Sequence, residues 1–419
     1  MTRHARFKRV VVFASLLVVR VLHGQQQSPW QDHFLQGSKA IQLGHYPDAR
    51  RLLLAALEDS NQFEVNDLRS AETKAALANL YTLQGELNLA SELYQQSRAI
   101  VEANGDTGKP FLAALLDGLG EVRVEQARWT EAEQLLQQSY ALHVELDGDN
   151  SPMTMAVARH LGELYACTGR DREAENLLQR AITVFRKSQH PEALASALMS
   201  LGRIYLEEAR YPLAENALKE AVGLDQRLGE NHPALGDAWL NLAILYRVEG
   251  HTERAEPLLQ KAAKIYRDAS DPHLAAVLSE MGLIALQHRK YAIAEANLKQ
   301  ALDILAETFR PDHVSVGVLE GSLAQVYFNE GEYSKAELFI RRALEKERRS
   351  LGEASFELAQ SVLIAAQIEE KQNRRLEADA DYRRAVALFG RLIGENHPGA
   401  LHAQELYSRF AKKIRRSDR

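Results

Sequence analysis

Apolar residues recur along most of the chain at intervals of three and four positions, the spacing that gives a helix one buried face. In residues 153–168, for example, Val157, Leu161 and Leu164 fall on one face, and residues 172–187 repeat the arrangement after a short turn. Because amphipathic helices alternate with short turns, the pattern predicts an all-α fold built from helical pairs.

One pair of helices recurs in nine copies, 39 to 42 residues apart. A glycine, or in four copies another residue, follows the first helix of each pair, where glycine commonly ends a helix. This turn column holds Gly44, Gly85, Ala127, Gly169, Ala209, Gly250, Arg289, Gly331 and Asn373. An alanine stands five positions after the turn column in every copy. Such regular spacing is typical of a repeat protein, in which each unit packs on its neighbours.

Two further columns indicate how the helices pack. Seven positions before the turn column the residue is always small: Gly37, Ala78, Gly120, Gly162, Gly202, Ala243, Gly282, Ala324 and Ala366. Nine positions after the turn column the residue is always large: Leu53, Tyr94, Leu136, Leu178, Leu218, Leu259, Leu298, Ile340 and Tyr382. A small residue lets a neighbouring backbone come close, and the large residue beside it fills the groove between the helices.

The phrase Leu201-Gly202-Arg203-Ile204-Tyr205 and the Leu-Gly-Glu-Asn-His-Pro linker at residues 228–233 resemble the tetratricopeptide repeat, in the 42-residue form of kinesin light chains and many bacterial scaffolds. The resemblance covers residues 30–414 and departs from the family pattern at Arg289 and Asn373. It implies a right-handed α-solenoid of about nine helix-turn-helix repeats, with a concave groove lined by the first helix of each pair. We therefore expect the solenoid at residues 29–397 and a capping helix with a basic tail at residues 398–419.

The first 24 residues have the pattern of a secretory signal peptide. Arg3 to Arg9 form a basic patch, Val10 to Val19 are unbroken apolar residues, and polar glutamines follow. As a helix, the apolar run would rise about 15 Å, roughly half of a hydrocarbon core, so it is too short to span a bilayer well. We expect residues 1–24 to direct export to the periplasm or cell envelope, with no stable transmembrane segment after their removal. An uncleaved anchor, or a start site misplaced upstream of a cytoplasmic protein, stays an alternative.

Charge and composition exclude several classes of function. The chain carries a net charge of −6, and without the first 24 residues, which hold five of the 51 basic residues and no acid, it carries −11. So acidic a body repels phosphate backbones, which argues against nucleic-acid binding. The single cysteine rules out an intramolecular disulfide and a cysteine-based metal cluster. Histidines recur near the linkers at His190, His232, His273, His313 and His397. Since they recur once per repeat and cannot converge, we interpret them as turn residues rather than metal ligands.

Residues of the first helices in copies four to six are the candidates for partner binding if the family geometry holds. These candidates are Arg159, His160, Met199, Arg203, Leu240, Asn241, Ile244 and Arg247. Arginine suits bidentate recognition of carboxylates. In tetratricopeptide domains that bind peptide tails, arginine, lysine and asparagine at such columns clamp carboxylates and the peptide backbone. The alternative is that these side chains only neutralise neighbouring glutamates.

The sequence thus predicts a non-catalytic scaffold that binds a peptide segment or a partner helix of another protein in its groove. No catalytic constellation, metal-ligand set or cofactor motif is recognisable, so no catalytic, metal or cofactor residues are expected. A self-assembling structural envelope protein, a cytoplasmic signalling adaptor and an enzyme with a site built on the groove are the alternatives.

Overall fold

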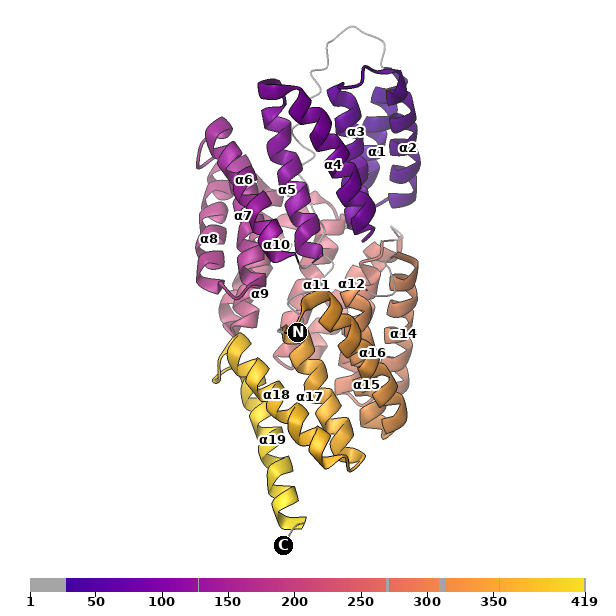
Figure 1. Cartoon of the computed structure of the whole chain (residues 1–419), viewed down its shortest axis with the longest axis vertical. Helices are drawn as coiled ribbons and strands as arrows, with labels where there is room; N and C mark the ends of the chain where they lie inside the picture. Colours follow the sequence, from indigo (N-terminus) through magenta and orange to yellow (C-terminus); the bar gives the residue numbers. More distant parts are fainter. Residues whose placement is uncertain (1–27, 127, 269–270, 309–312, 354, 418–419) are drawn as a thin grey trace.

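The computed structural model describes residues 28–126, 128–268, 271–308, 313–353 and 355–417, and every regular element within them is a helix (Figure 1). The predicted signal segment, residues 1–24, lies outside the described residues. The α-helices are α1 (Pro29–Gln42), α2 (Tyr46–Asp59), α3 (Leu68–Leu83), α4 (Leu87–Ala103), α5 (Lys109–Glu125), α6 (Trp129–Asp147), α7 (Pro152–Cys167), α8 (Asp171–Ser188), α9 (Pro191–Glu207), α10 (Tyr211–Asp225), α11 (Pro233–Val248), α12 (Thr252–Asp268), α13 (Leu274–Gln287), α14 (Tyr291–Thr308), α15 (Val314–Glu330), α16 (Tyr333–Leu351), α17 (Phe356–Lys371), α18 (Arg375–Ile393) and α19 (Pro398–Ser417).

Consecutive helices pack as hairpins from α1 with α2 to α17 with α18, and each hairpin packs on the next. Nine hairpins followed by one further helix, counted over the described ranges, confirm the predicted all-α solenoid. The stack curves so far that α18 and α19 return to the end of α9 (Figure 1). There, His397 Nε2 lies 2.8 Å from the backbone oxygen of Glu207. Residues 190 positions apart therefore meet across the coil.

The turn column has the left-handed backbone conformation at every described copy. Its glycines have φ between 73° and 88°, as in Gly85 and Gly331. Ala209, Arg289 and Asn373 keep the same conformation with φ of 57°, 56° and 61°. Since a side chain is strained at such angles, the repeat geometry imposes the turn even where glycine is missing. Ala127 lies outside the described residues.

The small and large columns meet inside each hairpin. An added Cβ at Gly202 would lie 2.8 Å from Leu218 Cγ, and one at Gly120 would lie 2.6 Å from Leu136 Cγ. Gly162 and Gly282 face the leucines of their own copies in the same way. In these glycine copies, contacts this short leave no room for a methyl group without a shift of the leucine, as expected if the small column sets the close approach of the two helices.

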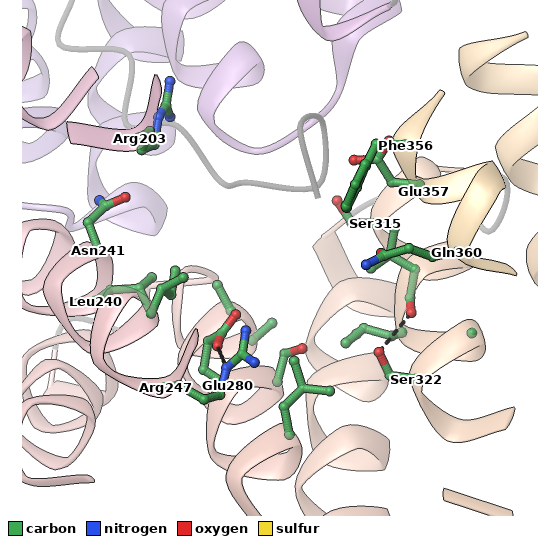
Figure 2. Close-up of a pocket in the computed structure, with 18 of the residues that line it drawn as sticks. Arg203, Leu240, Asn241, Arg247, Glu280, Ser315, Ser322, Phe356, Glu357 and Gln360 are labelled. Atoms are coloured by element: carbon green, nitrogen blue, oxygen red, sulfur yellow. Dashed lines mark hydrogen bonds and ion pairs between the residues drawn. The ribbon is translucent and has the colours of Figure 1, made fainter. Parts of the chain in front are cut away.

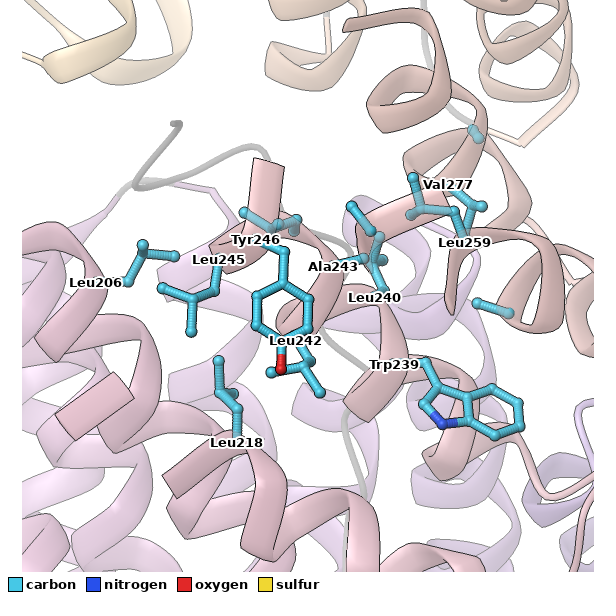
Figure 3. Packing of buried hydrophobic residues seen from close by; sticks show 14 of the residues in the cluster. Leu206, Leu218, Trp239, Leu240, Leu242, Ala243, Leu245, Tyr246, Leu259 and Val277 are labelled. Atoms are coloured by element: carbon cyan, nitrogen blue, oxygen red, sulfur yellow. The ribbon is translucent and has the colours of Figure 1, made fainter. Parts of the chain in front are cut away.

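The apolar core runs along the solenoid rather than gathering in one centre. Its largest cluster extends from α7 to α17, and Figure 3 shows the part in which Leu206, Leu218 and Tyr246 pack beside Leu242 and Leu245. Because each hairpin buries its apolar faces against the next one, the first helices keep one face turned to the inside of the coil.

The linker histidines begin the helices that follow them. His232 Nδ1 accepts a hydrogen bond from the backbone N–H of Ala234, and His313 and His397 do the same for Ser315 and Gly399. Each ring therefore satisfies a backbone donor that a helix start leaves without a partner. These bonds agree with the interpretation of the histidines as turn residues.

Candidate functional site

The inner face of the coil encloses a groove with a volume of about 590 Å³. Its walls come from the first helices of the hairpins, from α5 to α17, and from α19. The second helices of the hairpins contribute Leu305, Glu347 and Phe389. This arrangement is the one that the family resemblance implied.

Seven of the eight candidate residues line this groove. They are Arg159, Met199, Arg203, Leu240, Asn241, Ile244 and Arg247. They come from three neighbouring helices, α7, α9 and α11, which form one wall. Leu240 and Ile244 also belong to the core, and they show the groove only a small part of their surface.

His160, the eighth candidate, does not line the groove. Its ring is 4% exposed and lies between two carboxylates of α5, with Nδ1 at 2.7 Å from Asp117 and Nε2 at 2.8 Å from Glu121. Helical geometry explains the difference from Arg159, because adjacent residues on a helix point about 100° apart. The ring faces the neighbouring α5, while the Arg159 side chain reaches the groove.

The surroundings of His160 favour its charged form. Burial and the nearby Arg159 guanidinium lower its pKa, but Asp117 and Glu121 outweigh both and raise the pKa to about 9. At neutral pH the ring is therefore an imidazolium held between two carboxylates. It links α7 to α5 as a structural ion pair.

The three groove arginines differ in their pairing. Arg159 Nη1 lies 2.8 Å from Glu163, and Arg247 Nε lies 2.5 Å from Glu280. The alternative role of neutralising glutamates therefore describes these two side chains. Among the residues that the structure describes, Arg203 makes no hydrogen bond or ion pair, although it is half-buried on the groove wall. Arg203 is thus the cation of the three left available to an incoming anion.

Asn241 lies close to Arg203 on the same wall. Its Nδ2 donates to the backbone oxygen of Asp237 at 2.8 Å, which orients the amide. Figure 2 shows Arg203 and Asn241 on one side of the opening and Ser315, Phe356 and Gln360 across it. The groove therefore has two walls, here called the α7–α11 wall and the α15–α17 wall after the helices that form them.

Sequence reasoning did not find the α15–α17 wall. Its polar residues include Ser315, Ser322, Glu357, Gln360 and Ser361, and Glu347 reaches it from α16. One signal was available for Glu347. Sixteen positions after the turn column, five copies carry an apolar core residue, such as Val101, Phe185 or Leu305, whereas the eighth copy carries Glu347 and the fifth carries Asp225.

Glu347 is 1% exposed, and its neighbours do not compensate its charge. The Ser361 hydroxyl donates to Oε1 at 3.1 Å, while Oε2 has no hydrogen-bond partner. Burial, and after it the carboxylates of Glu357 and Glu320, raise the pKa of Glu347 to about 8 against the effect of the Ser361 hydrogen bond. The groove thus holds a carboxyl group that is mostly protonated at neutral pH.

Across the described ranges, every helix is too short or too polar to serve as a membrane span.

Comparison with known proteins identifies the repeat. A tetratricopeptide repeat model matches residues 111–187, 193–268 and 273–346, more than half of the chain, and a second tetratricopeptide repeat model matches residues 365–399. The chain is 26% identical over 221 residues to Protein KINESIN LIGHT CHAIN-RELATED 3 of Arabidopsis thaliana, which is 51% of this chain and 33% of that protein. The chain spans about a third of the length of the curated relatives it matches.

Two solved structures share the fold at low sequence identity. A Rap protein complexed with competence and sporulation factor has a TM-score of 0.54 at 13% identity, covering 93% of this chain and 99% of that one. The apo form of the quorum sensor NprR from B. thuringiensis has a TM-score of 0.54 at 14% identity, covering 86% and 98%. With its nine hairpins and these matches, the chain belongs to the tetratricopeptide repeat family of protein-interaction scaffolds, and its repeats are of the kinesin-light-chain type.

Proposed function

We propose that this protein is a non-catalytic scaffold whose groove holds an extended segment of a partner protein. The observation that carries the proposal is Arg203, a half-buried cation on the groove wall with no partner among the described residues. Keeping a guanidinium partly desolvated and unpaired costs free energy, and a bound carboxylate would offset that cost through two parallel hydrogen bonds.

The surface around Arg203 suits a peptide. Met199, Leu240 and Ile244 supply apolar contact beside it, and Asn241 presents an amide that can bond a peptide backbone. Arg159 and Arg247 flank this patch, each held by its own glutamate. A small number of oriented polar groups on a mostly apolar wall is the usual composition of a recognition groove. The Rap protein, whose fold is similar, is in complex with competence and sporulation factor, which supports ligand binding by a coil of this kind.

We also propose that the protein acts outside the cytoplasm, since residues 3–19 have the basic and apolar parts of an export signal. N-terminal sequencing of the protein from its native cells tests this directly. A mature chain beginning near Gln25 in the cell envelope supports export, and a cytosolic chain beginning at Met1 contradicts it.

Site-specific photocrosslinking tests the groove. A photoreactive amino acid at Met199 faces the groove, while the same probe at Leu213 lies exposed on α10, outside the groove lining. In living cells, we expect Met199 to capture a partner that Leu213 does not. Arg203→Glu should abolish the adduct, because it places a negative charge where the partner carboxylate binds.

The matched control for that charge reversal is Arg172→Glu, at an exposed residue of α8 that does not line the groove. It should leave the adduct unchanged. An adduct that survives both Arg203→Glu and Arg247→Glu would contradict the assignment of the groove. An adduct between two copies of the chain would favour self-assembly instead.

A further inference from the structure

The eighth hairpin carries an acid at a position where five other copies carry a buried apolar residue and the fifth copy carries Asp225. Val101, Phe185 and Phe389 occupy the equivalent position in other copies and are buried apolar residues. Glu347 is buried to the same extent, and like Phe389 it lines the groove. Burying a carboxyl group in place of an apolar side chain weakens the hairpin unless a partner binds it.

Two glycines of α15 make room for this side chain. An added Cβ at Gly317 would lie 3.4 Å from Glu347 Cγ, and one at Gly321 would lie 3.2 Å from Ser361 Oγ. Gly317 lies in the first turn of α15 and Gly321 lies in its interior, where glycine costs about 1 kcal/mol relative to alanine. Gly321 itself lines the groove. The backbone of α15 is therefore recessed where Glu347 reaches the groove from α16.

The cations near Glu347 are engaged elsewhere. Lys346 Nζ lies 2.7 Å from Glu320, so the lysine next in sequence is paired with another acid. Glu357 of α17 adds a second negative group on the groove side, and the Ser361 hydroxyl donates to Glu347. Oε2 of Glu347 is left without a hydrogen-bond partner, 1% exposed and lining the groove.

We propose that Glu347 and Ser361 form a subsite for a cationic group, the ammonium of a lysine or the guanidinium of an arginine in the segment that the groove binds. The subsite rests on the proposed function, because the cation belongs to that segment. Each such group would donate to Oε2, the atom that lacks a partner. Phe356 and Phe389, whose ring centroids lie 5.6 Å apart, line the same groove and suit the apolar stem of such a side chain.

The subsite gives the groove a direction. Arg203 on the α7–α11 wall takes an acidic group, and Glu347 on the α15–α17 wall takes a basic one. The bound segment therefore carries both charges and lies in one orientation across the groove. Binding a cation would ionise Glu347, since a nearby positive charge lowers the pKa that burial has raised. Protons would be released on binding at neutral pH.

A displayed library of random linear 12-residue peptides tests the subsite without knowledge of the natural partner. The unchanged full chain, Glu347→Gln, Arg203→Glu and the control Glu345→Gln are panned in parallel. Glu345 lies on the same helix, is exposed and pairs with Arg349. We expect the unchanged chain and Glu345→Gln to select peptides that carry an acid and a lysine or arginine. Glu347→Gln should lose the selection for the basic residue alone.

Peptides selected by the unchanged chain then give two measurements. Fluorescence polarisation should show at least a roughly tenfold weaker affinity for Glu347→Gln, as expected for a hydrogen bond to a charged group. Calorimetry in buffers of different ionisation enthalpy should show proton release at pH 7 that Glu347→Gln abolishes. Proton release separates a ligand contact from a purely structural role. The groups facing Glu347 are Glu320 from α15, Glu357 from α17 and Lys346 from its own helix.

The outcomes distinguish the two proposals. Peptides that bind, are lost with Arg203→Glu and yet show no preference for a basic residue overturn the cation subsite and leave the proposed function standing. If Glu347→Gln binds the peptides with the same affinity and the same proton release as the unchanged chain, the cation subsite is likewise overturned and the proposed function stands. If no selected peptide depends on Arg203, both the groove function and the subsite are overturned.

Discussion

The two walls of the groove are built from the same repeat but differ in how their buried charged groups are paired. On the α7–α11 wall, Arg159, His160 and Arg247 each lie within 2.8 Å of a carboxylate. On the α15–α17 wall, Glu347 is buried with an oxygen that lacks any hydrogen-bond partner. The paired groups hold helices together. The groups that we assign to a ligand are Arg203, which makes no hydrogen bond or ion pair among the described residues, and Glu347, whose Oε2 has no hydrogen-bond partner.

This difference suggests how charged residues that stabilise a solenoid can be distinguished from charged residues that bind a ligand. Breaking a buried ion pair removes stability, because the remaining charge is left uncompensated. Neutralising a buried group that has no partner should instead add stability, and the loss should appear in binding. Since each repeat packs mainly on its neighbours, local opening measured by hydrogen exchange reports on one wall at a time.

The largest effect is expected for His160→Gln on the α7–α11 wall. The substitution leaves Asp117 and Glu121 without their cation, which should lower the local stability of α5 to α7 by about 3–5 kcal/mol. Hydrogen exchange of these helices at pH 6 measures the change. Arg203→Gln, at a half-buried side chain without a partner, is the control and should change stability by less than about 0.5 kcal/mol. A loss below about 1 kcal/mol for His160→Gln would show that the pair is not structural.

The pH dependence of that effect follows from the raised pKa of His160, which is about 9 in the fold against 6.5 in the unfolded chain. The contribution is fully present below pH 6.5 and is lost as the pH rises through 9. The difference between the variant and the unchanged protein should therefore shrink over this interval.

Glu347→Gln on the α15–α17 wall should increase the stability of the fold, whereas His160→Gln should decrease it. In the fold the pKa of Glu347 is about 8, against 4.5 in the unfolded chain, so the folded state binds the proton more tightly. The unchanged protein should lose stability between pH 4.5 and pH 8, and the variant should not, giving a gain of about 4 kcal/mol at pH 8. Hydrogen exchange of α15 to α17 from pH 5 to pH 9 measures it. A variant that is less stable at pH 8 would make Glu347 a structural acid.

Glycines should also behave differently on the two walls. Gly202→Ala on α9 pushes a methyl group against Leu218 Cγ at 2.8 Å and should cost about 1–2 kcal/mol. Gly321→Ala on α15 meets Ser361 Oγ at 3.2 Å, and the better helix propensity of alanine offsets the crowding, so its stability should change little. Urea unfolding compares the two variants. Equal losses would mean that the recess in α15 is required for packing rather than kept for the groove.

The smallest effect concerns the turns that end the two walls. Ala209 follows the end of α9 and Gly331 follows the end of α15, both in the left-handed conformation. Ala209→Gly should relieve strain and stabilise the protein by about 0.5–1 kcal/mol, and Gly331→Ala should destabilise it by a similar amount. Thermal unfolding of both variants checks the pair. A loss of stability for Ala209→Gly would show that the repeat does not impose this turn.

Much of the fold follows from the sequence because its determinants are local. The turn column, the small column and the large column act within one hairpin, and the structure pairs Gly202 with Leu218 and Gly120 with Leu136 accordingly. The α7–α11 wall could also be predicted from the sequence. Helical periodicity and the repeat pattern pointed to eight candidate residues, and seven of them line the groove.

His160 is the candidate residue that does not line the groove, and its orientation could not be predicted from its own repeat alone. It follows Arg159 directly, and its position on the helix left it open whether it faced the groove or α5. Two acids of the neighbouring hairpin, Asp117 and Glu121, decide the matter, because an imidazolium between them is far better solvated than it would be elsewhere in the core.

The sequence by itself determined the helices, their pairing and the stacking of nine hairpins, since each depends on contacts between residues at most about one repeat apart. Only the tertiary structure decided which walls face each other across the groove, that His397 meets Glu207, and that Glu347, although buried, lines the groove. The physical reason is that small rotations between neighbouring hairpins add up along the stack. Which distant repeats meet depends on the total rotation, and the sequence of one repeat does not show that total.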